Sequence, residues 1–268
     1  MKLPLAILAG GLGKRLKDKT LNSPKALIDV FGKPFISRQL NYLQKQGFNK
    51  IIICTAYLGG KIRNYVGNGK DYGMDIEYSD DGDQLLGTGG AIKKALKFIN
   101  KDFFILYGDS FLPINFSLVE KAFLEEGKPA LMTVLKNVGQ WDKSNAYFKN
   151  KLVYYNKKEP KADMNYIDYG LSVVNNSIFK DFPDGKKFEL ADVFEKFRDV
   201  SLETYQLDPA YYYTTPALSW DACLKKSKQE LELLTDYDMY LMIERGIRGG
   251  VSMISNRYAK ANNKYMKD

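Results

Sequence analysis

The sequence predicts an α/β sandwich, in which helices cover both faces of a mainly parallel mixed sheet, with a short, mostly helical segment after it. Continuous apolar runs at residues 3–8, 50–55 and 103–107 are typical of strands that are covered on both faces. Helical patterns alternate with these runs, which is the order expected for a largely parallel sheet. Glycine-rich or acidic segments follow the first and third runs directly, at the strand ends where open α/β sheets bind ligands.

The first run leads into a glycine-rich loop and then into a short extended segment at residues 26–30. A helix follows, because Ile36, Leu40 and Leu43 recur at the spacing of one helical face. Gly47 ends this helix, and the second buried run comes next.

A second glycine-rich segment, residues 87–90, precedes a helix whose Ile92, Ala95, Leu96 and Ile99 share one face. The first turn of that helix presents N–H groups and a positive dipole end, so we expect it to favour an anion or a base edge. Beyond the third buried run we expect a helix at 116–126, a strand at 130–135, a hairpin through 149–151, a strand at 166–175 and a helix at about 191–198.

Composition is that of a globular protein. Its 268 residues suffice for one large α/β domain or for a domain with a small appendage. No apolar run approaches the roughly 18 residues that a membrane span needs, and the N-terminus leads into a strand rather than a signal peptide. Cys54 and Cys223 lack the spacing of zinc sites or disulfide frameworks, and Cys54 fits a small buried hydrophobe. We therefore expect a soluble cytoplasmic protein with no membrane partner.

The sequence contains no histidine. This excludes Ser-His chemistry, imidazole metal sites and the usual acid/base group at neutral pH. Catalysis would have to use carboxylates, cations and bound metal, which suits phosphoryl-type transfer because that chemistry rests on positioning and charge stabilisation. The net charge of +8 is spread along the chain without a long basic block, so it favours small anionic substrates over nucleic acid.

The loop after the first strand is suited to phosphate. Its glycines allow the backbone to bring bare N–H groups against a ligand, and nearby cations supply charge that glycine cannot. The glycines are Gly10, Gly11 and Gly13, and the cations are Lys14, Arg15 and Lys25.

Two well-known phosphate loops do not fit this spacing. A dinucleotide fingerprint read from Gly11 and Gly13 needs a third glycine where the sequence has Leu16. A Walker A loop read over the same residues needs Gly and Ser or Thr at positions occupied by Leu8 and Arg15.

The remaining pattern is L-A-G-G-x-G-x-R-L followed by Ser23-Pro24-Lys25. This combination resembles the sugar-1-phosphate nucleotidyltransferases, also called nucleotide-sugar pyrophosphorylases. The resemblance covers residues 1 to about 198 and implies a Rossmann-like fold, with Mg²⁺ as cofactor. It also implies transfer of a nucleotidyl group from a nucleoside triphosphate to a sugar 1-phosphate, giving a nucleotide sugar and pyrophosphate. The alternative is a glycine-rich strand-to-helix turn with solvated charges.

The resemblance implies roles for individual residues. Asp109, which follows the third buried run, would bind magnesium, while Arg15 and Lys25 would oppose charge on the leaving phosphates and the α-phosphate. These three are the candidate catalytic residues. The candidate nucleotide-binding residues are Leu8, Ala9, Gly10, Gly11, Gly13, Lys14, Gln84, Gly87 and Thr88. The candidate sugar-phosphate residues are Asn145, Lys158, Gly170, Glu189 and Asp192.

Several of these residues also have a purely structural interpretation. Asp109 could be a turn residue at a strand end, and Lys158 could belong to a solvated face among other lysines. Glu189 and Asp192 could flank a helix start, where carboxylates interact favourably with the helix dipole.

The sequence changes character near residue 199. Members of the family usually continue into further strands and a short motif that completes the metal site, and nothing like it follows here. Residues 199–268 instead resemble a stretch of protein-primed family B DNA polymerases, through runs such as Leu207-Asp208-Pro209 and Glu244-Arg245-Gly246-Ile247-Arg248. That stretch lies ahead of the first catalytic carboxylate motif of the palm, which the sequence does not reach, so alone it cannot copy DNA.

We therefore predict a nucleotidyltransferase domain at 1–198 and a foreign polymerase-like segment at 199–268, joined near residues 193–201. The missing second metal contact would weaken activity. The alternative function is a nucleic-acid-binding or non-catalytic chimeric protein, which would use basic residues of the C-terminal segment. These are Arg245, Arg248, Arg257 and Lys260, next to Tyr258.

Overall fold

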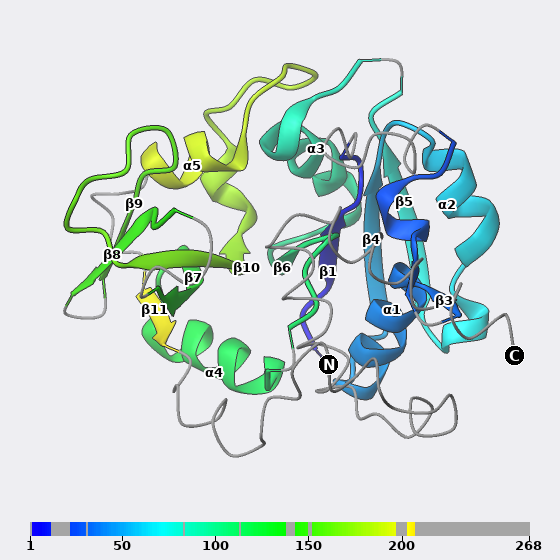
Figure 1. The fold of residues 1–268 in the computed structure, drawn as a ribbon, viewed down its shortest axis with the longest axis horizontal. Helices are drawn as coiled ribbons and strands as arrows, with labels where there is room; N and C mark the ends of the chain where they lie inside the picture. The colour runs from blue at the N-terminus through cyan, green and yellow to red at the C-terminus, as the bar shows by residue number, and fades with distance from the viewer. Residues whose placement is uncertain are drawn as a thin grey trace, which may run out of the picture.

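The computed structural model describes residues 2–11, 22–30, 32–82, 84–112, 114–137, 143–149, 152–196 and 203–206. Their main feature is a mixed sheet with the strand order β5-β4-β1-β6-β10-β7-β11-β9-β8 (Figure 1). A two-stranded sheet, β2 (Asp29–Val30) with β3 (Lys33–Pro34), lies outside it.

The half of the large sheet that carries the first part of the chain is parallel. Strand β1 (Leu5–Leu8) lies between β4 (Lys50–Thr55) and β6 (Asp102–Tyr107), and β5 (Asp75–Asp80) pairs with the far side of β4. All four strands run in the same direction, so their carboxyl ends meet at one edge of the sheet. This half confirms the predicted parallel α/β arrangement.

The other half is mostly antiparallel. Strand β10 (Tyr166–Asn175) pairs antiparallel with both β6 and β7 (Ala130–Lys136). Beyond β7 lie β11 (Glu203–Gln206), β9 (Leu152–Tyr155) and β8 (Ala146–Lys149), and the antiparallel pairing of β8 with β9 confirms the predicted hairpin.

Helices cover both faces of the sheet. On one face pack α1 (Phe35–Lys45), α2 (Gly59–Val66) and α4 (Phe116–Glu126), and on the other α3 (Gly87–Ala95) and α5 (Leu190–Lys196). Short 3-10 turns occur at Lys25–Leu27, Lys70–Tyr72, Leu96–Phe98 and Asn176–Phe179.

The alternation of side chains along β6 shows why the buried strands lack polar positions. Phe104 packs edge-on against Phe48 and also contacts Phe116 on the α1 and α4 face. Its neighbour Phe103 points to the other face, where its ring lies 6.4 Å from that of Phe179. Both faces of β6 are covered by helices and are shielded from water. Every position between its ends therefore has to be apolar, as the sequence predicted.

The structure also corrects the sequence analysis in places. Of the extended segment predicted at 26–30, residues 29–30 form β2, but residues 26–27 belong to a 3-10 turn, because the N–H groups of Leu27 and Ile28 donate back to the carbonyls of Pro24 and Lys25. Helix α2 and strand β5 were not predicted. Cys54 is buried, and burial raises the pKa of its thiol, which fits the predicted hydrophobic role. No helix in the described part of the chain is long and apolar enough to cross a membrane.

Residues 203–206 lie beyond the predicted domain boundary at 198, yet they form β11 and pair in parallel with β7. The remainder of the predicted polymerase-like segment, including Arg245, Arg248, Arg257, Tyr258 and Lys260, lies outside the described residues.

Candidate functional site

The candidate site lies where β1, β4 and β6 end side by side. The N–H of Ala9 donates to the Cys54 carbonyl at 2.9 Å, and the N–H of Gly108 donates to the Leu8 carbonyl at 3.0 Å. A Cβ on Gly108 would lie 2.6 Å from that carbonyl oxygen, and one on Gly10 would lie 3.0 Å from Ala56 Cβ. These glycines therefore bring backbone against backbone at the sheet edge, whereas a Cβ on Gly11 would meet open space.

At this edge the structure brings together two of the predicted catalytic residues, although they lie far apart in sequence. Lys25 Nζ lies 2.5 Å from Asp109 Oδ2, and the two side chains are 27% and 42% exposed. An ion pair this exposed contributes about 0–1 kcal/mol to stability. The small contribution of this ion pair to stability does not explain why the two charged side chains lie together at the carboxyl edge of the sheet.

Other candidates from the glycine loop divide in two groups. Leu8 ends β1, and Ala9, Gly10 and Gly11 continue from it along the sheet edge. The predicted nucleotide contacts Gly13 and Lys14, and the predicted catalytic Arg15, lie outside the described residues.

The turn that carries Asp109 is held by a residue that the sequence analysis missed. Gln39 of α1 is buried, and its Nε2 donates to the carbonyls of Ser110 at 2.7 Å and Tyr107 at 3.3 Å, on either side of Asp109. The signal was available, since Gln39 is a polar residue on the apolar face that Ile36, Leu40 and Leu43 define.

The first turn of α3 differs from the expectation that its N–H groups favour an external ligand. The N–H groups of Gly89 and Gly90 donate to the Phe188 carbonyl at 3.0 and 3.2 Å. The N–H and hydroxyl of Thr88 donate to Glu189 Oε2 at 3.3 and 2.8 Å. The anion at this helix start is therefore the chain's own carboxylate, and these donors are used within the protein.

The glycines of α3 are explained by the same contact. Gly87 has φ +71°, a left-handed conformation, and its Cβ would lie 2.5 Å from the Phe188 carbonyl oxygen. A Cβ on Gly89 would lie 2.4 Å from the Phe188 ring, which stacks on Phe182. Close packing of residues 186–190, rather than phosphate, requires these glycines.

Gly89→Ala should therefore lower the free energy of unfolding by about 1–3 kcal/mol, the usual cost of overpacking. The matched control is Gly60→Ala in the first turn of α2, where a Cβ meets nothing within 4 Å. Ala is the better helix former, so this change should stabilise the protein by up to about 1 kcal/mol. Urea unfolding of both variants measures the two effects, and equal effects would contradict the packing explanation.

Gln84 lines a groove of about 610 Å³ beside α3. Lys93, Lys94 and Lys97 also line it, opposite Asp184. Neither Lys25 nor Asp109 contributes to this groove, so it is separate from the lysine and aspartate pair. Asp81 belongs to its lining, and burial raises the pKa of that carboxyl.

The predicted sugar-side residues Asn145 and Gly170 meet at a break in β10. Asn145 Oδ1 accepts the N–H of Asp168 at 3.0 Å, and Asp168 Oδ1 accepts the N–H of Gly170 at 2.9 Å. The register of β10 against β7 shifts between Asp168 and Ser172, and Gly170 has φ +92°. A polar residue and a glycine inside an apolar strand were the sequence signal for this irregularity, and Asp168 was missed.

Tyr107 connects this break to the end of β6. Its hydroxyl is hydrogen-bonded to Asp168, and burial raises the pKa of Tyr107 well above its usual range. Tyr107 also lies two residues before Asp109, at the end of β6. It therefore connects Asp168, at the irregular part of β10, with the segment that carries the Asp109 carboxylate.

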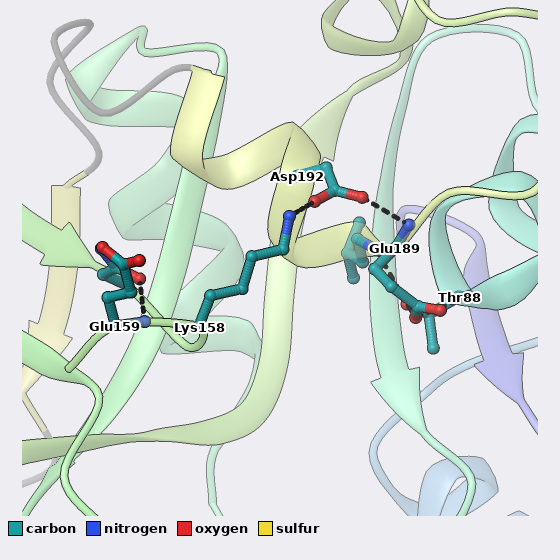
Figure 2. A network of polar contacts seen from close by, with 7 residues as sticks. Thr88, Lys158, Glu159, Glu189 and Asp192 are labelled. Carbon is teal, nitrogen blue, oxygen red and sulfur yellow. Dashed lines mark hydrogen bonds and ion pairs between the residues drawn. The ribbon is translucent and has the colours of Figure 1, made fainter.

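The remaining sugar-side candidates form one network (Figure 2). Lys158 Nζ donates to Asp192 Oδ1, and Asp192 Oδ2 accepts the N–H of Glu189 at 2.9 Å. The carboxylate of Glu189 in turn accepts the hydrogen bonds from Thr88. The structure thus places Glu189 and Asp192 at the start of α5, as the structural interpretation expected, and adds the contact of Lys158 with Asp192.

One carboxylate at the sheet edge, that of Asp109, is a candidate ligand for a divalent ion. No group of three or more His, Cys, Asp or Glu side chains gathers anywhere in the described ranges. Mg²⁺ usually binds proteins through one or two carboxylates and takes further ligands from substrate phosphates and water. The half-exposed carboxylate of Asp109 fits that role.

A parallel sheet with a glycine turn, a cation and a carboxylate at its carboxyl edge is an arrangement typical of α/β proteins that bind phosphate-containing ligands. Residues 5–147 match the model of the family described as Nucleotidyl transferase. The chain belongs to this family, which confirms the resemblance stated for its first part.

Individual relatives agree with this assignment. A D-glycero-α-D-manno-heptose 1-phosphate guanylyltransferase from Campylobacter jejuni is 33% identical over 221 residues, which cover 77% of this chain and 96% of the relative. The enzyme of the same name from Aneurinibacillus thermoaerophilus is 28% identical, covering 84% and 97%. The crystal structure of HddC from Yersinia pseudotuberculosis complexed with GMP-PN has a TM-score of 0.66 at 25% identity, covering 77% and 91%.

Proposed function

We propose that this chain transfers a nucleotidyl group from a nucleoside triphosphate to a sugar 1-phosphate, forming a nucleotide sugar and pyrophosphate. The observation that carries the proposal is the contact of Lys25 with Asp109 at the carboxyl edge of the parallel strands, in a chain of the Nucleotidyl transferase family. The basic C-terminal segment remains the alternative as a nucleic-acid-binding part, but the family match does not favour it.

In the proposed reaction an oxygen of the sugar phosphate attacks the α-phosphorus in line. The new phosphorus–oxygen bond forms as the bond to the bridging oxygen breaks, and that oxygen leaves with pyrophosphate. No covalent enzyme intermediate and no histidine are needed. The protein has to hold two anions together and oppose the negative charge that develops on the α-phosphoryl oxygens.

We assign both parts of that task to residues of the sheet edge and of the glycine loop. Lys25 would donate N–H groups toward the α-phosphate, and Asp109 would hold a Mg²⁺ ion bound together with the triphosphate. When bound, this ion supplies positive charge against the departing pyrophosphate. Gln39 fixes the turn that carries Asp109, because it binds the carbonyls on both sides of it. Arg15 and Lys14 complete the set as the loop cations on the phosphates.

In this proposal the nucleotide binds at the parallel half of the sheet, and the sugar 1-phosphate binds at the mostly antiparallel half. Leu8, Ala9, Gly10, Gly11 and Gly13 would hold the nucleotide phosphates, while Gln84 and the turn at Gly87 and Thr88 would border the base. The N–H and hydroxyl of Thr88 would not contact the base, because Glu189 accepts both. On the sugar side, Lys158 binds the phosphate, and Asn145 and Gly170 line the pocket at the break in β10. Glu189 and Asp192 border the same pocket from the start of α5.

Guanosine triphosphate and a heptose 1-phosphate are the substrates to examine first. Two relatives that the chain matches over 96% and 97% of their lengths are heptose 1-phosphate guanylyltransferases. Other relatives are glucose-1-phosphate enzymes that transfer uridylyl, cytidylyl or thymidylyl groups. We propose the cytoplasm, where nucleoside triphosphates are made, as the compartment of the reaction.

We propose residues 1–198, extended by β11, as the catalytic domain. The parallel pairing of β11 with β7 supports an extension of this domain to about residue 206. The match to the Aneurinibacillus thermoaerophilus relative covers 84% of the chain, which is more than residues 1–206 contain. In this proposal the polymerase-like addition therefore begins beyond residue 206, within the C-terminal part of the chain, and takes no part in the transfer.

The test is a pyrophosphate-release screen with Mg²⁺, the four nucleotides GTP, UTP, CTP and dTTP, and heptose or glucose 1-phosphates. We expect release that requires both substrates and is highest with one pair. Silence across the panel would contradict the proposal. Tight, salt-sensitive DNA binding that depends on residues 207–268 would support the alternative instead.

A further inference from the structure

A continuous chain of polar contacts links the first turn of α3 to Lys158 through the first turn of α5. In Figure 2, the Lys158 side chain extends from its loop toward Asp192, and Glu189 lies between Asp192 and Thr88. Helix α5 packs against both α3 and β9, so it joins the part of the sheet that carries the nucleotide residues to the part that carries the sugar residues.

Each oxygen of the Asp192 carboxylate has its own partner. Oδ1 accepts from the Lys158 ammonium, and Oδ2 accepts the N–H of Glu189 at 2.9 Å. The hydrogen bond from Lys158 holds the pKa of Asp192 below its usual range, with help from the Glu189 N–H. The same hydrogen bond raises the pKa of Lys158. Both groups are therefore charged across the pH range in which nucleotide chemistry runs.

The position of Asp192 is itself fixed from the nucleotide side. Glu189 Oε2 accepts from the Thr88 hydroxyl at 2.8 Å, and the same hydroxyl accepts the N–H of Leu190 at 2.8 Å. The start of α5 is thereby tied to the start of α3. Asp192 extends from this fixed turn.

Lys158 has little else to orient it. Its backbone follows a turn in which Asn156 Oδ1 accepts the N–H of Glu159 at 2.8 Å, but its side chain is 63% exposed. A lysine has four rotatable side-chain bonds, so an exposed ammonium has no preferred position without a partner. The ammonium carries three N–H donors, and Asp192 uses one, which leaves two for phosphate oxygens.

We propose that Asp192 is a positioning residue, which holds the Lys158 ammonium at a fixed distance from the nucleotide-side turn so that it receives the phosphate of the sugar substrate. This inference rests on the proposed function. It changes the role expected for Asp192 from a direct contact with the sugar-phosphate substrate to a contact with the lysine that binds it. It also gives Glu189 and Thr88 a part in setting the distance between the two substrates.

The test is a double-mutant cycle of Asp192→Asn and Lys158→Ala, measured with the best substrate pair of the pyrophosphate-release screen. An asparagine turns a donor either toward the ammonium or toward the Glu189 N–H, so one contact is lost. We expect Asp192→Asn to lower kcat/KM for the sugar 1-phosphate by about tenfold or more, with KM for the nucleotide almost unchanged. In the Lys158→Ala background the same change should have almost no further effect, because Asp192 acts through Lys158.

Asp181→Asn is the matched control. Asp181 pairs at 2.8 Å with Lys196, which lies on α5 like Asp192, and both side chains are about half exposed. In the described part of the chain neither residue forms a hydrogen bond with Thr88, Lys158, Glu189 or Asp192. We expect Asp181→Asn to leave turnover unchanged.

Three results would overturn the inference. An equal loss from Asp192→Asn with and without Lys158 would show that Asp192 only supports α5. An increase in kcat/KM would show that Asp192 withholds the lysine from substrate. Absence of turnover in the wild-type protein would contradict the proposed function and the inference together, whereas the first two results contradict the inference alone.

Discussion

Asp109→Asn is expected to lower kcat by about a thousandfold or more, with at most about 1 kcal/mol change in the free energy of unfolding. The substitution keeps the shape of the side chain and removes the negative charge on which a divalent ion depends. The carboxylate of Asp109 is 42% exposed, and within the described part of the chain it forms an ion pair with Lys25. Folding therefore depends little on this carboxylate. Turnover by pyrophosphate release and unfolding in urea measure the two quantities.

Asp102→Asn is the matched control for this prediction. Asp102 lies at the other end of β6 and accepts a hydrogen bond from Asn175 Nδ2 at 2.7 Å, far from the carboxyl edge. It should retain activity within about threefold because Asp102 lies at the opposite end of β6 from the site, although its side chain is only 13% exposed. Equal activity of the Asp109 and Asp102 variants would remove Asp109 from the metal site.

Lys25→Met is expected to lower kcat by about a hundredfold to a thousandfold, the usual loss for one preorganised donor to a developing anion. It should not weaken metal binding. Lys25 Nζ contacts Asp109 Oδ2, so its removal frees that oxygen and takes away a positive charge that repels the ion. Mn²⁺ affinity by electron paramagnetic resonance should therefore stay the same or increase while turnover falls.

This opposite behaviour separates two roles of the lysine. A variant that loses both Mn²⁺ affinity and turnover would show that Lys25 only holds Asp109 in place. Lys61→Met serves as the control, because Lys61 Nζ donates to the Asn22 carbonyl at 2.5 Å in the same region and has no contact with Asp109. The Lys61→Met variant should turn over substrate at the wild-type rate.

Three of the four strands of the parallel half, β1, β4 and β6, could be predicted because they are buried on both faces. Strand β5 has exposed and half-buried positions and was not predicted. Residues such as Ile51 to Ile53 and Phe103 to Leu106 have to be apolar at every position, and that pattern is visible without any partner strand. The residues at the ends of those strands were predictable for the same reason, since the carboxyl edge of a parallel sheet follows from the strand directions. Asp109 was found in this way, whereas Lys25 was found from the motif that follows the glycine loop.

The network at α5 was not predictable in detail. The residues 87–90 have the glycine pattern of a ligand-binding turn, and only the structure shows that residues 186–190 occupy their N–H groups. The two segments are about a hundred residues apart, and a single sequence gives no sign that they touch. Lys158 and Asp192 show the same limit, because each has a sufficient local explanation as a solvated or helix-capping residue.

Gln39 and Asp168 illustrate a different limit. Each was visible as a polar residue in an apolar pattern, but such a residue is equally consistent with a satisfied core group. Which backbone groups it binds depends on the packing of α1 against the 107–110 turn and on the register shift in β10. These are tertiary features that local periodicity does not determine.

The measurement that tests nucleotidyl transfer most directly follows a label through the reaction. With radiolabel on the α-phosphate of the nucleotide, all transferred label should appear in the nucleotide sugar. With label on the γ-phosphate, it should appear in pyrophosphate. γ-Label found in a sugar diphosphate or in orthophosphate would mean a kinase or a hydrolase, and would contradict the proposed reaction.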